Sequence, residues 1–323
     1  MRRREFSAAL AGLVVFARQA HAEDKVRRIG VLVSVLTPEL MGEWLEGLHQ
    51  RGYVVGKNLQ IEYRFTAGRS EGLTSLAAEL AALAPELIVA AAPGPAQAVR
   101  TVAPNIPLVF VNVADPVMIG LVKSLAHPGG NATGIATIVP EGFQGKSYQL
   151  LKQLVPHATR IAALYNPANP MHRRHYATEG SEIARQLGFK LIFVEATVPD
   201  QFETAFDHAS NQGAEAINVL GDALTYANSE KMVALAARYR LPAMYFFTRS
   251  VLDGGLMSFG PDLPYGWRAA AAYVDKILRG ERPADIPVVQ PTRYKMLINK
   301  KTATSLGLTI SPSILGQADE VIE

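Results

Sequence analysis

The chain contains 323 residues, of which 49% are hydrophobic and 19% are charged, as in a folded globular protein with one large or two medium domains. The absence of cysteine excludes disulfide bonds and a lipid-modified N-terminal cysteine. The formal charge of +3 gives no support to nucleic-acid binding, because the first 22 residues hold four of the 32 basic residues and one of the 29 acidic ones. The remaining chain is therefore neutral.

Residues 1–22 have the three parts of a secretory signal peptide. Met1–Glu5 is a basic head, Phe6–Ala17 is a short apolar run, and Ala20–Ala22 is an A-x-A cleavage site. The apolar run is too short to span a bilayer. An Arg-Arg-x-Phe sequence in the head also fits a twin-arginine signal, so both the Sec and the twin-arginine routes stay open. We expect a cleaved protein that is located in a periplasm and is not lipidated.

The first half of the remaining chain alternates buried strands with amphipathic helices. Continuous apolar runs such as Pro107–Val113 are typical of strands buried on both faces of a sheet. Leu59–Phe65 instead alternates apolar and polar residues, which predicts a half-exposed strand near a sheet edge. Behind Asp115 and Pro116, a short helix is predicted over Met118–Leu125. The predicted strands lie at residues 28–34, 59–65, 86–92 and 107–113. Helices between them imply a parallel sheet with right-handed crossovers.

The same alternation restarts after Thr133–Ala136, which indicates a second lobe of similar size. Its predicted strands lie at residues 160–165, 190–195, 214–220 and 243–247. Gly254–Gly260 predicts one more strand, followed by a helix that buries Trp267, and Pro283–Pro291 is a proline-rich connector. A strand at residues 296–299 and a small helix over Lys301–Leu306 complete the fold. These late segments are too short for a third domain, so we expect the two lobes to share them.

Four predicted strands end in a small or polar residue followed by proline at a helix start. Each pair places a helix N-terminus, with free N–H groups and the positive end of the helix dipole, at the carboxyl edge of a sheet. Ligands of open α/β sheets bind at that edge, so the pattern predicts a cleft that favours a carboxylate or a phosphate. The alternative is that proline at the first helical position is only good capping. The pairs are Thr37-Pro38, Gly94-Pro95, Asp115-Pro116 and Asn169-Pro170.

Two further motifs could carry chemistry. Gly68–Gly72 fits the G-x-S-x-G nucleophile pattern, and a secreted serine hydrolase using Ser70 is therefore the alternative function. A nucleophile elbow follows a central buried strand, however, whereas the strand before Ser70 alternates. His172 and His175 have a spacing that could share a metal ion, but no acidic partner lies at ligand spacing, so a solvated basic face is favoured. We predict no catalytic residues, no metal and no cofactor.

Four sequence runs, in order along the chain, carry a family resemblance. They are PLVFVNVADPVMIGLVKSLAHPGGNATG at residues 107–134, NPANP at 166–170, GGLMSFGPD at 254–262 and PADIPVVQPTRYKMLINKKTATSLGLTISPSIL at 283–315. Together they resemble the substrate-binding proteins of ABC transporters of the tryptophan/tyrosine-type family. The resemblance implies an α/β type I periplasmic-binding-protein fold, with two doubly wound parallel-sheet lobes joined by a three-stranded hinge. Residues 23–137 and about 262–290 would form one lobe, and 138–261 and about 291–323 the other.

The resemblance also implies a non-enzymatic receptor that captures a small ligand by hinge closure. A monomer would deliver this ligand to an ABC permease with its ATPase at the inner membrane. We expect a small carboxylate-bearing ligand, first an aromatic or aliphatic amino acid. A transcription regulator shares this fold, but it would need a DNA-binding segment where the sequence has an export signal.

The residues carried over as ligand contacts lie at strand ends and crossings. Asn112 is preferred over Asp115, since Asp115 could serve only as a cap. The predicted contacts are Ser34, Thr37, Gly94, Asn112 and Asp115 from the first lobe, Asn166, Asn169, Asp222 and Phe247 from the second, and Thr137 and Phe259 at the crossings.

Overall fold

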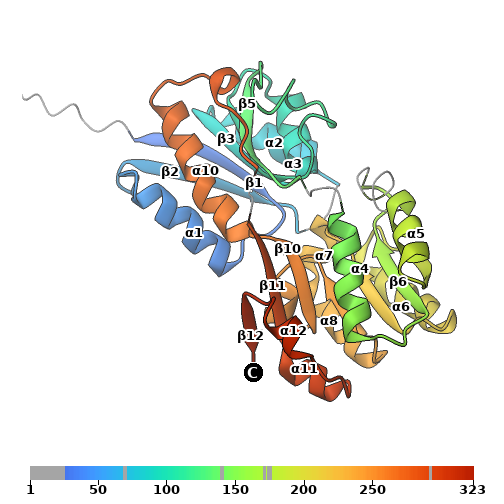
Figure 1. Cartoon of the computed structure of the whole chain (residues 1–323). Coiled ribbons are helices and arrows are strands. Elements are labelled where there is room, and N and C mark those ends of the chain that lie inside the picture. Colours follow the sequence, from blue (N-terminus) through green and yellow to red (C-terminus); the bar gives the residue numbers. More distant parts are fainter. Residues whose placement is uncertain (1–25, 68–70, 139–141, 170–171, 173–176, 291–292) are drawn as a thin grey trace, which may run out of the picture.

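Two α/β lobes, each built on its own sheet, make up the molecule (Figure 1). This arrangement confirms the predicted fold class. The computed structural model describes residues 26–67, 71–138, 142–169, 172, 177–290 and 293–323. The predicted signal peptide lies outside the described residues.

The first lobe has a five-stranded parallel sheet between two helical layers. Its strands are β1 (Arg27–Val33), β2 (Leu59–Phe65), β3 (Leu87–Ala91), β4 (Leu108–Val113) and β5 (Ala132–Ala136), in the order β2-β1-β3-β4-β5. Helices α1 (Pro38–His49) and α10 (Leu263–Leu278) cover one face, and α2 (Leu73–Ala82) and α3 (Pro93–Val102) cover the other. Along β1, Ile29 and Val31 pack under α1 and α10, whereas Leu32 packs under α2 and α3. β2 is an edge strand, as predicted.

The second lobe has a seven-stranded sheet in the order β12-β11-β10-β9-β8-β6-β7, which is parallel except for the β10–β11 pair. Its strands are β6 (Arg160–Tyr165), β7 (Lys190–Glu195), β8 (Ala216–Val219), β9 (Ala243–Tyr245), β10 (Met257–Pro261), β11 (Tyr294–Asn299) and β12 (Glu320–Ile322). Its helices are α4 (Phe143–Leu154), α5 (Ala177–Gln186), α6 (Phe202–Asn211), α7 (Ala223–Ala227), α8 (Ser229–Arg238), α9 (Arg249–Leu252), α11 (Lys300–Ser305) and α12 (Pro312–Leu315). The predictions omitted α7, α9, α12 and β12, each of which is five residues or shorter.

The helix predicted over Met118–Leu125 is wrong, because this segment forms successive turns. The backbone N–H groups of Leu121 and Val122 both donate to the carbonyl of Pro116, and Gly120 has a φ of +72°. A left-handed residue interrupts a right-handed helix. The turns let Leu121 and Val122 enter the core of the first lobe, where both are buried.

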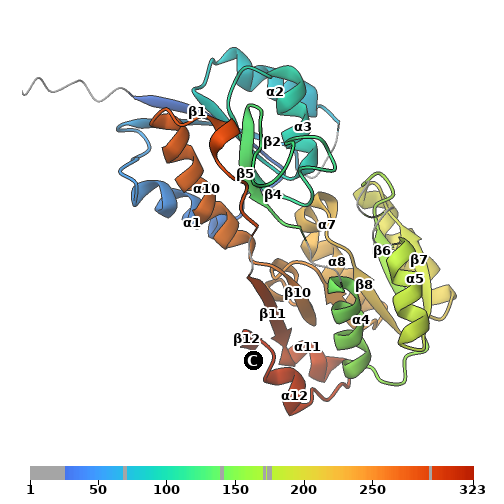
Figure 2. The same ribbon diagram turned by 45° about the horizontal axis from the view of Figure 1, so that its top comes forward.

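Helix α10 packs on the first sheet, although the strands before and after it in the chain belong to the second sheet. Trp267 of α10 meets Trp44 of α1 edge to face, with ring centroids 5.6 Å apart, and both side chains are buried. The connector after α10 also stays with the first lobe, since Val289 N–H donates to Gly134 O at 3.1 Å. Among the described elements, the chain therefore passes between the lobes three times: between β5 and α4, between β10 and α10, and between Val289 and β11 (Figure 2).

Two glycines of α1 give a matched test of the α1–α10 packing. A Cβ at Gly47 would lie 2.9 Å from both Ala271 Cβ and Arg268 O, whereas a Cβ at the exposed Gly42 would have nothing within 4 Å. Gly42→Ala should raise the free energy of unfolding by about 0.5–1 kcal/mol through helix propensity. Gly47→Ala should lower it by about 1–3 kcal/mol through overpacking. Urea unfolding measures both, and equal stabilisation by the two changes would contradict this packing.

Candidate functional site

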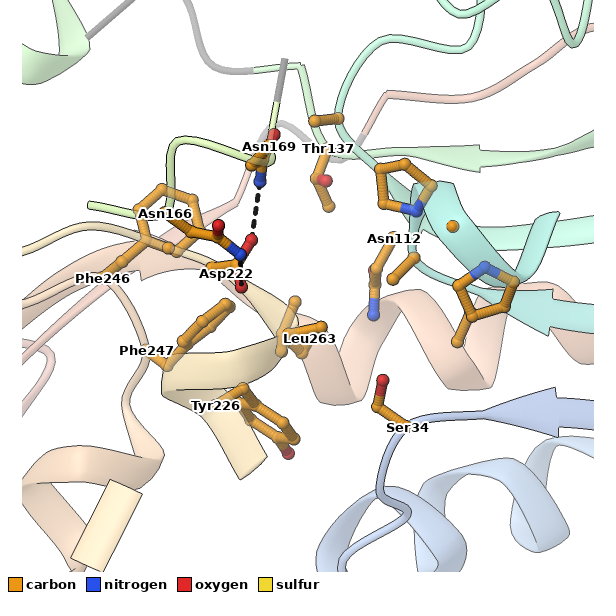
Figure 3. A pocket seen from close by; sticks show the side chains of 18 of the residues that line it. Ser34, Asn112, Thr137, Asn166, Asn169, Asp222, Tyr226, Phe246, Phe247 and Leu263 are labelled. Atoms are coloured by element: carbon orange, nitrogen blue, oxygen red, sulfur yellow. Dashed lines mark hydrogen bonds between the residues drawn. The ribbon is translucent and has the colours of Figure 1, made fainter. Parts of the chain in front are cut away.

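A cleft of about 680 Å³ lies between the two lobes, and residues from both sheets line it (Figure 3). The first lobe contributes residues at or after the ends of β1 to β5, and the second contributes residues after β6, β7, β8 and β9. All of these are the carboxyl ends of parallel strands, the edge at which α/β sheets bind ligands. The topology therefore brings two such edges face to face.

Nine of the eleven predicted contact residues line the cleft: Ser34, Gly94, Asn112, Asp115, Thr137, Asn166, Asn169, Asp222 and Phe247. Whether they touch a ligand stays a prediction. The structure places the other two outside the lining. Thr37 is buried and caps α1, since its Oγ1 accepts from Leu40 N at 3.3 Å. Phe259 stacks on Phe143, with ring centroids 4.9 Å apart, and packs against the core of the second lobe.

The sequence predicted four helix N-termini with free N–H groups at the cleft, and the described residues do not show them. The side chain of Thr37 already occupies the start of α1. Helix α3 begins at Pro93, so Pro93 and Pro95 remove two of the N–H groups of its first turn. The Oδ1 atom of Asp115 accepts from Met118 N at 2.9 Å and so caps a turn rather than a helix. Pro170 lies outside the described residues.

The charged side chains among the described lining residues are all acidic: Glu71, Asp115, Glu179 and Asp222. No positively charged side chain among the described lining residues therefore supports the predicted preference for an anion. A ligand that enters this cleft gains from a positive group, whereas an anionic group on it must be met by neutral donors.

Several hydrogen bonds hold the carboxylate of Asp222 in place. Its Oδ1 accepts from Asn166 Nδ2 at 3.2 Å and from Leu224 N at 2.9 Å, and its Oδ2 accepts from Asn169 Nδ2 at 2.8 Å (Figure 3). Thr225 completes a capping box with Asp222 at the start of α7. All of these donors are neutral, so they orient the carboxylate without cancelling its charge.

Aromatic rings form one wall of the cleft in the second lobe. Phe247 lies edge to face with both Tyr226 and Phe246, at 5.0 Å in each case. The backbone of Gly221 approaches Phe246 so closely that a Cβ there would lie 2.3 Å from the ring. The predicted contact set missed Tyr226 and Phe246. Phe246 lies within the predicted strand at residues 243–247, next to the predicted contact Phe247, and this position could have indicated it. Tyr226 lies on the unpredicted helix α7.

Tyr226 also reaches the first lobe, where it packs against the core that contains Trp44. Burial raises the pKa of its hydroxyl to about 12, although a side-chain hydrogen bond with Thr37 opposes this rise. Thr37, predicted as a ligand contact, thus takes part in a contact between the lobes.

A family model described as ABC transporter substrate binding protein matches residues 29–322. The chain belongs to this family. It is 25% identical over 288 residues to the tyrosine-binding protein of Clostridioides difficile, a match that covers 88% of this chain and 82% of that protein.

Two solved structures of similar proteins superpose on most of this chain. A conserved domain protein from Vibrio cholerae has a TM-score of 0.84 and 28% identity, covering 92% of this chain and all of that one. The ABC domain from Streptococcus pneumoniae in complex with L-Trp has a TM-score of 0.82 and 27% identity, covering 92% of this chain and 99% of that one.

The described residues give no support to a serine hydrolase at Ser70 or to a metal site at His172 and His175. Ser70 and His175 lie outside the described residues. The strand that precedes Ser70, β2, is an edge strand, unlike the central strand of a nucleophile elbow. The described residues contain no cluster of three metal-ligating side chains, and no described helix is long and apolar enough to cross a membrane.

His172 is buried instead of lying on a solvated basic face, so that prediction is wrong for this residue. Asn166 N donates to its Nδ1 at 3.0 Å, so the proton sits on Nε2, which donates to Gly221 O at 2.9 Å. Burial lowers the pKa of the imidazole, and the nearby Asp222 carboxylate opposes this shift. Neutral His172 therefore ties the loop after β6 to the loop after β8, which carries Asp222.

The lowered pKa of His172 predicts acid sensitivity. As the pH falls below about 6.5, the unfolded chain takes up this proton before the folded protein does. Stability should therefore fall with decreasing pH, with a slope of at most about 1.4 kcal/mol per pH unit from this group. In His172→Gln, whose amide can accept and donate in the same way, that part of the slope should vanish. Urea unfolding between pH 7.5 and 5 measures the slope, and identical slopes in the two proteins would contradict the assignment.

Proposed function

We propose that this protein is the ligand-capturing receptor of an ABC importer and that it binds an amino acid with an aromatic side chain between its lobes. One observation carries the proposal: the cleft combines a fixed, uncompensated carboxylate, Asp222, with an aromatic wall. Such a site fits a small ligand that has an ammonium group and a ring.

The ammonium end of the ligand is assigned to Asp222. In the described part of the chain no lysine or arginine pairs with this carboxylate. Its hydrogen-bond donors, two asparagine amides and backbone N–H groups at the start of α7, are neutral. The negative charge of Asp222 is therefore not balanced by these donors, and it attracts an ammonium group. The asparagines that hold Asp222 would also keep it from turning away when the ligand leaves.

The carboxylate end of the ligand is assigned to the first lobe. Ser34, Asn112 and Thr137 present neutral hydroxyl and amide groups across the cleft from Asp222 (Figure 3). Neutral donors can bind a carboxylate without attracting every anion in solution. The four acidic lining residues would repel a ligand that carries a carboxylate but no positive group.

The aromatic side chain of the ligand is assigned to the wall formed by Tyr226, Phe246 and Phe247. Edge-to-face and stacked rings add to the gain from burying apolar surface. The relatives support this ligand class, since one is named a tyrosine-binding protein and another was solved with L-Trp.

A ligand held in this way contacts both lobes, so it binds the closed arrangement more tightly and shifts the population toward it. The three passages of the chain between the lobes would serve as the hinge. In this proposal, residues 23–137 and about 262–290 move as one body, and 138–261 and about 291–323 as the other. The protein acts as a periplasmic monomer without a cofactor and delivers its ligand to a permease with its ATPase.

Asp222→Asn tests the proposal, because asparagine also caps helices well but lacks the charge. The wild-type protein should bind L-tryptophan or L-tyrosine. It should bind tryptamine and indole-3-propionate much more weakly, because each of these keeps only one of the two charged ends. In Asp222→Asn the affinity for the amino acids should fall about tenfold or more. Isothermal titration calorimetry measures each affinity.

Asp115→Asn is the matched control, because it removes another lining carboxylate that also caps the backbone. Its affinity should stay close to that of the wild type. The proposed ligand class fails if the wild type binds indole-3-propionate as tightly as L-tryptophan, or if it binds none of these compounds.

A further inference from the structure

Asn112 occupies an irregular position at the end of β4. The register between β4 and β5 shifts between Phe110 and Val113, and Asn112 has a φ of +55°, in the left-handed region. Asparagine tolerates this conformation better than most other residues with a side chain. A bulge of this kind re-aims a side chain. Here it turns the amide of Asn112 from the sheet toward the cleft (Figure 3).

The two ends of this amide have different surroundings. Its Oδ1 is buried and has no hydrogen-bond partner among the described residues. An unpaired buried oxygen lowers stability, so the packing of the fold alone does not account for an asparagine here. Its Nδ2 points into the cleft, on the side where Ser34 lies (Figure 3). The amide thus presents a donor to whatever occupies the cleft.

Gly266, on α10, provides the room for this arrangement. A Cβ at Gly266 would lie 2.3 Å from Asn112 Oδ1 and 3.2 Å from its Cγ. Glycine inside a helix is less favourable than alanine, and Gly266 is the fourth residue of the 16-residue α10. Three locally unfavourable features therefore meet at one amide: a left-handed residue, an unpaired buried oxygen and a helical glycine. Such features concentrate at functional sites.

We propose that Gly266 is a positioning residue that fixes the Asn112 amide so that its Nδ2 donates to the carboxylate of the bound ligand. The inference rests on the proposed function and assigns one end of the ligand within that site. Gly266 itself does not touch the ligand. Because glycine has no Cβ, the amide oxygen of Asn112 can occupy the space beside α10.

A double-mutant cycle tests the pair, with L-tryptophan and L-tyrosine as probes in calorimetry and the melting temperature as a second readout. Asn112→Gly keeps the left-handed backbone but removes the donor, so the affinity should fall about tenfold or more. Gly266→Ala should lower it similarly by displacing the amide. In the Asn112→Gly background, Gly266→Ala should cost no further affinity and should raise the melting temperature through helix propensity. Gly42→Ala is the control for an added methyl group and should bind like the wild type.

Asn112→Asp tests the direction of the hydrogen bond. A carboxylate at this position repels a ligand carboxylate, so the affinity should fall further than in Asn112→Gly, whereas tighter binding would overturn the donor assignment. The proposal is also overturned if Gly266→Ala binds like the wild type, or if it weakens binding equally with and without Asn112. In those cases the wild type still binds and the proposed function stands. If the wild type binds neither amino acid, the proposed function fails and the donor role fails with it.

Discussion

The packing of α10 on the first sheet is the constraint on which the rest of the structure depends. Trp267 and Trp44 meet in the core of the first lobe, while the strands on either side of α10 belong to the second sheet. The chain must therefore cross between the lobes before and after this helix, which keeps the two sheet edges facing one another. The N-terminal part of the same helix carries Gly266, which lies against Asn112 in the cleft. One helix thus links the stability of a lobe to the geometry of the site.

The polarity of the cleft follows from how each lobe ends its strands. In the second lobe, the loops after β6 and β8 hold Asp222 through two asparagine amides and the buried, neutral His172. In the first lobe, Ser34, Asn112 and Thr137 add neutral polar side chains to the lining, which also contains the carboxylates of Glu71 and Asp115. A ligand with opposite charges at its two ends would bridge these unlike surfaces, so it would gain most when the lobes close. This division of roles makes binding and closure parts of one event.

Much of the fold could be predicted from the sequence, because strands buried on both faces leave continuous apolar runs such as Pro107–Val113. The predictions failed where the outcome depends on contacts between distant segments. Leu121 and Val122 form turns because they enter the core, and Thr37 leaves the cleft lining because its hydroxyl caps α1 and meets Tyr226. Strand ends could be located, so most predicted contact residues do line the cleft. The role of Gly266 could not be found, since it depends on an amide from a different part of the chain.

Small-angle X-ray scattering with and without ligand tests the central claim most directly, because closure of two lobes makes the molecule more compact. We predict that L-tryptophan or L-tyrosine lowers the radius of gyration of the wild-type protein, and that Asp222→Asn needs about tenfold more ligand or more for the same change. Binding of either amino acid, seen by calorimetry, without any change in the radius of gyration would contradict capture by closure of the lobes.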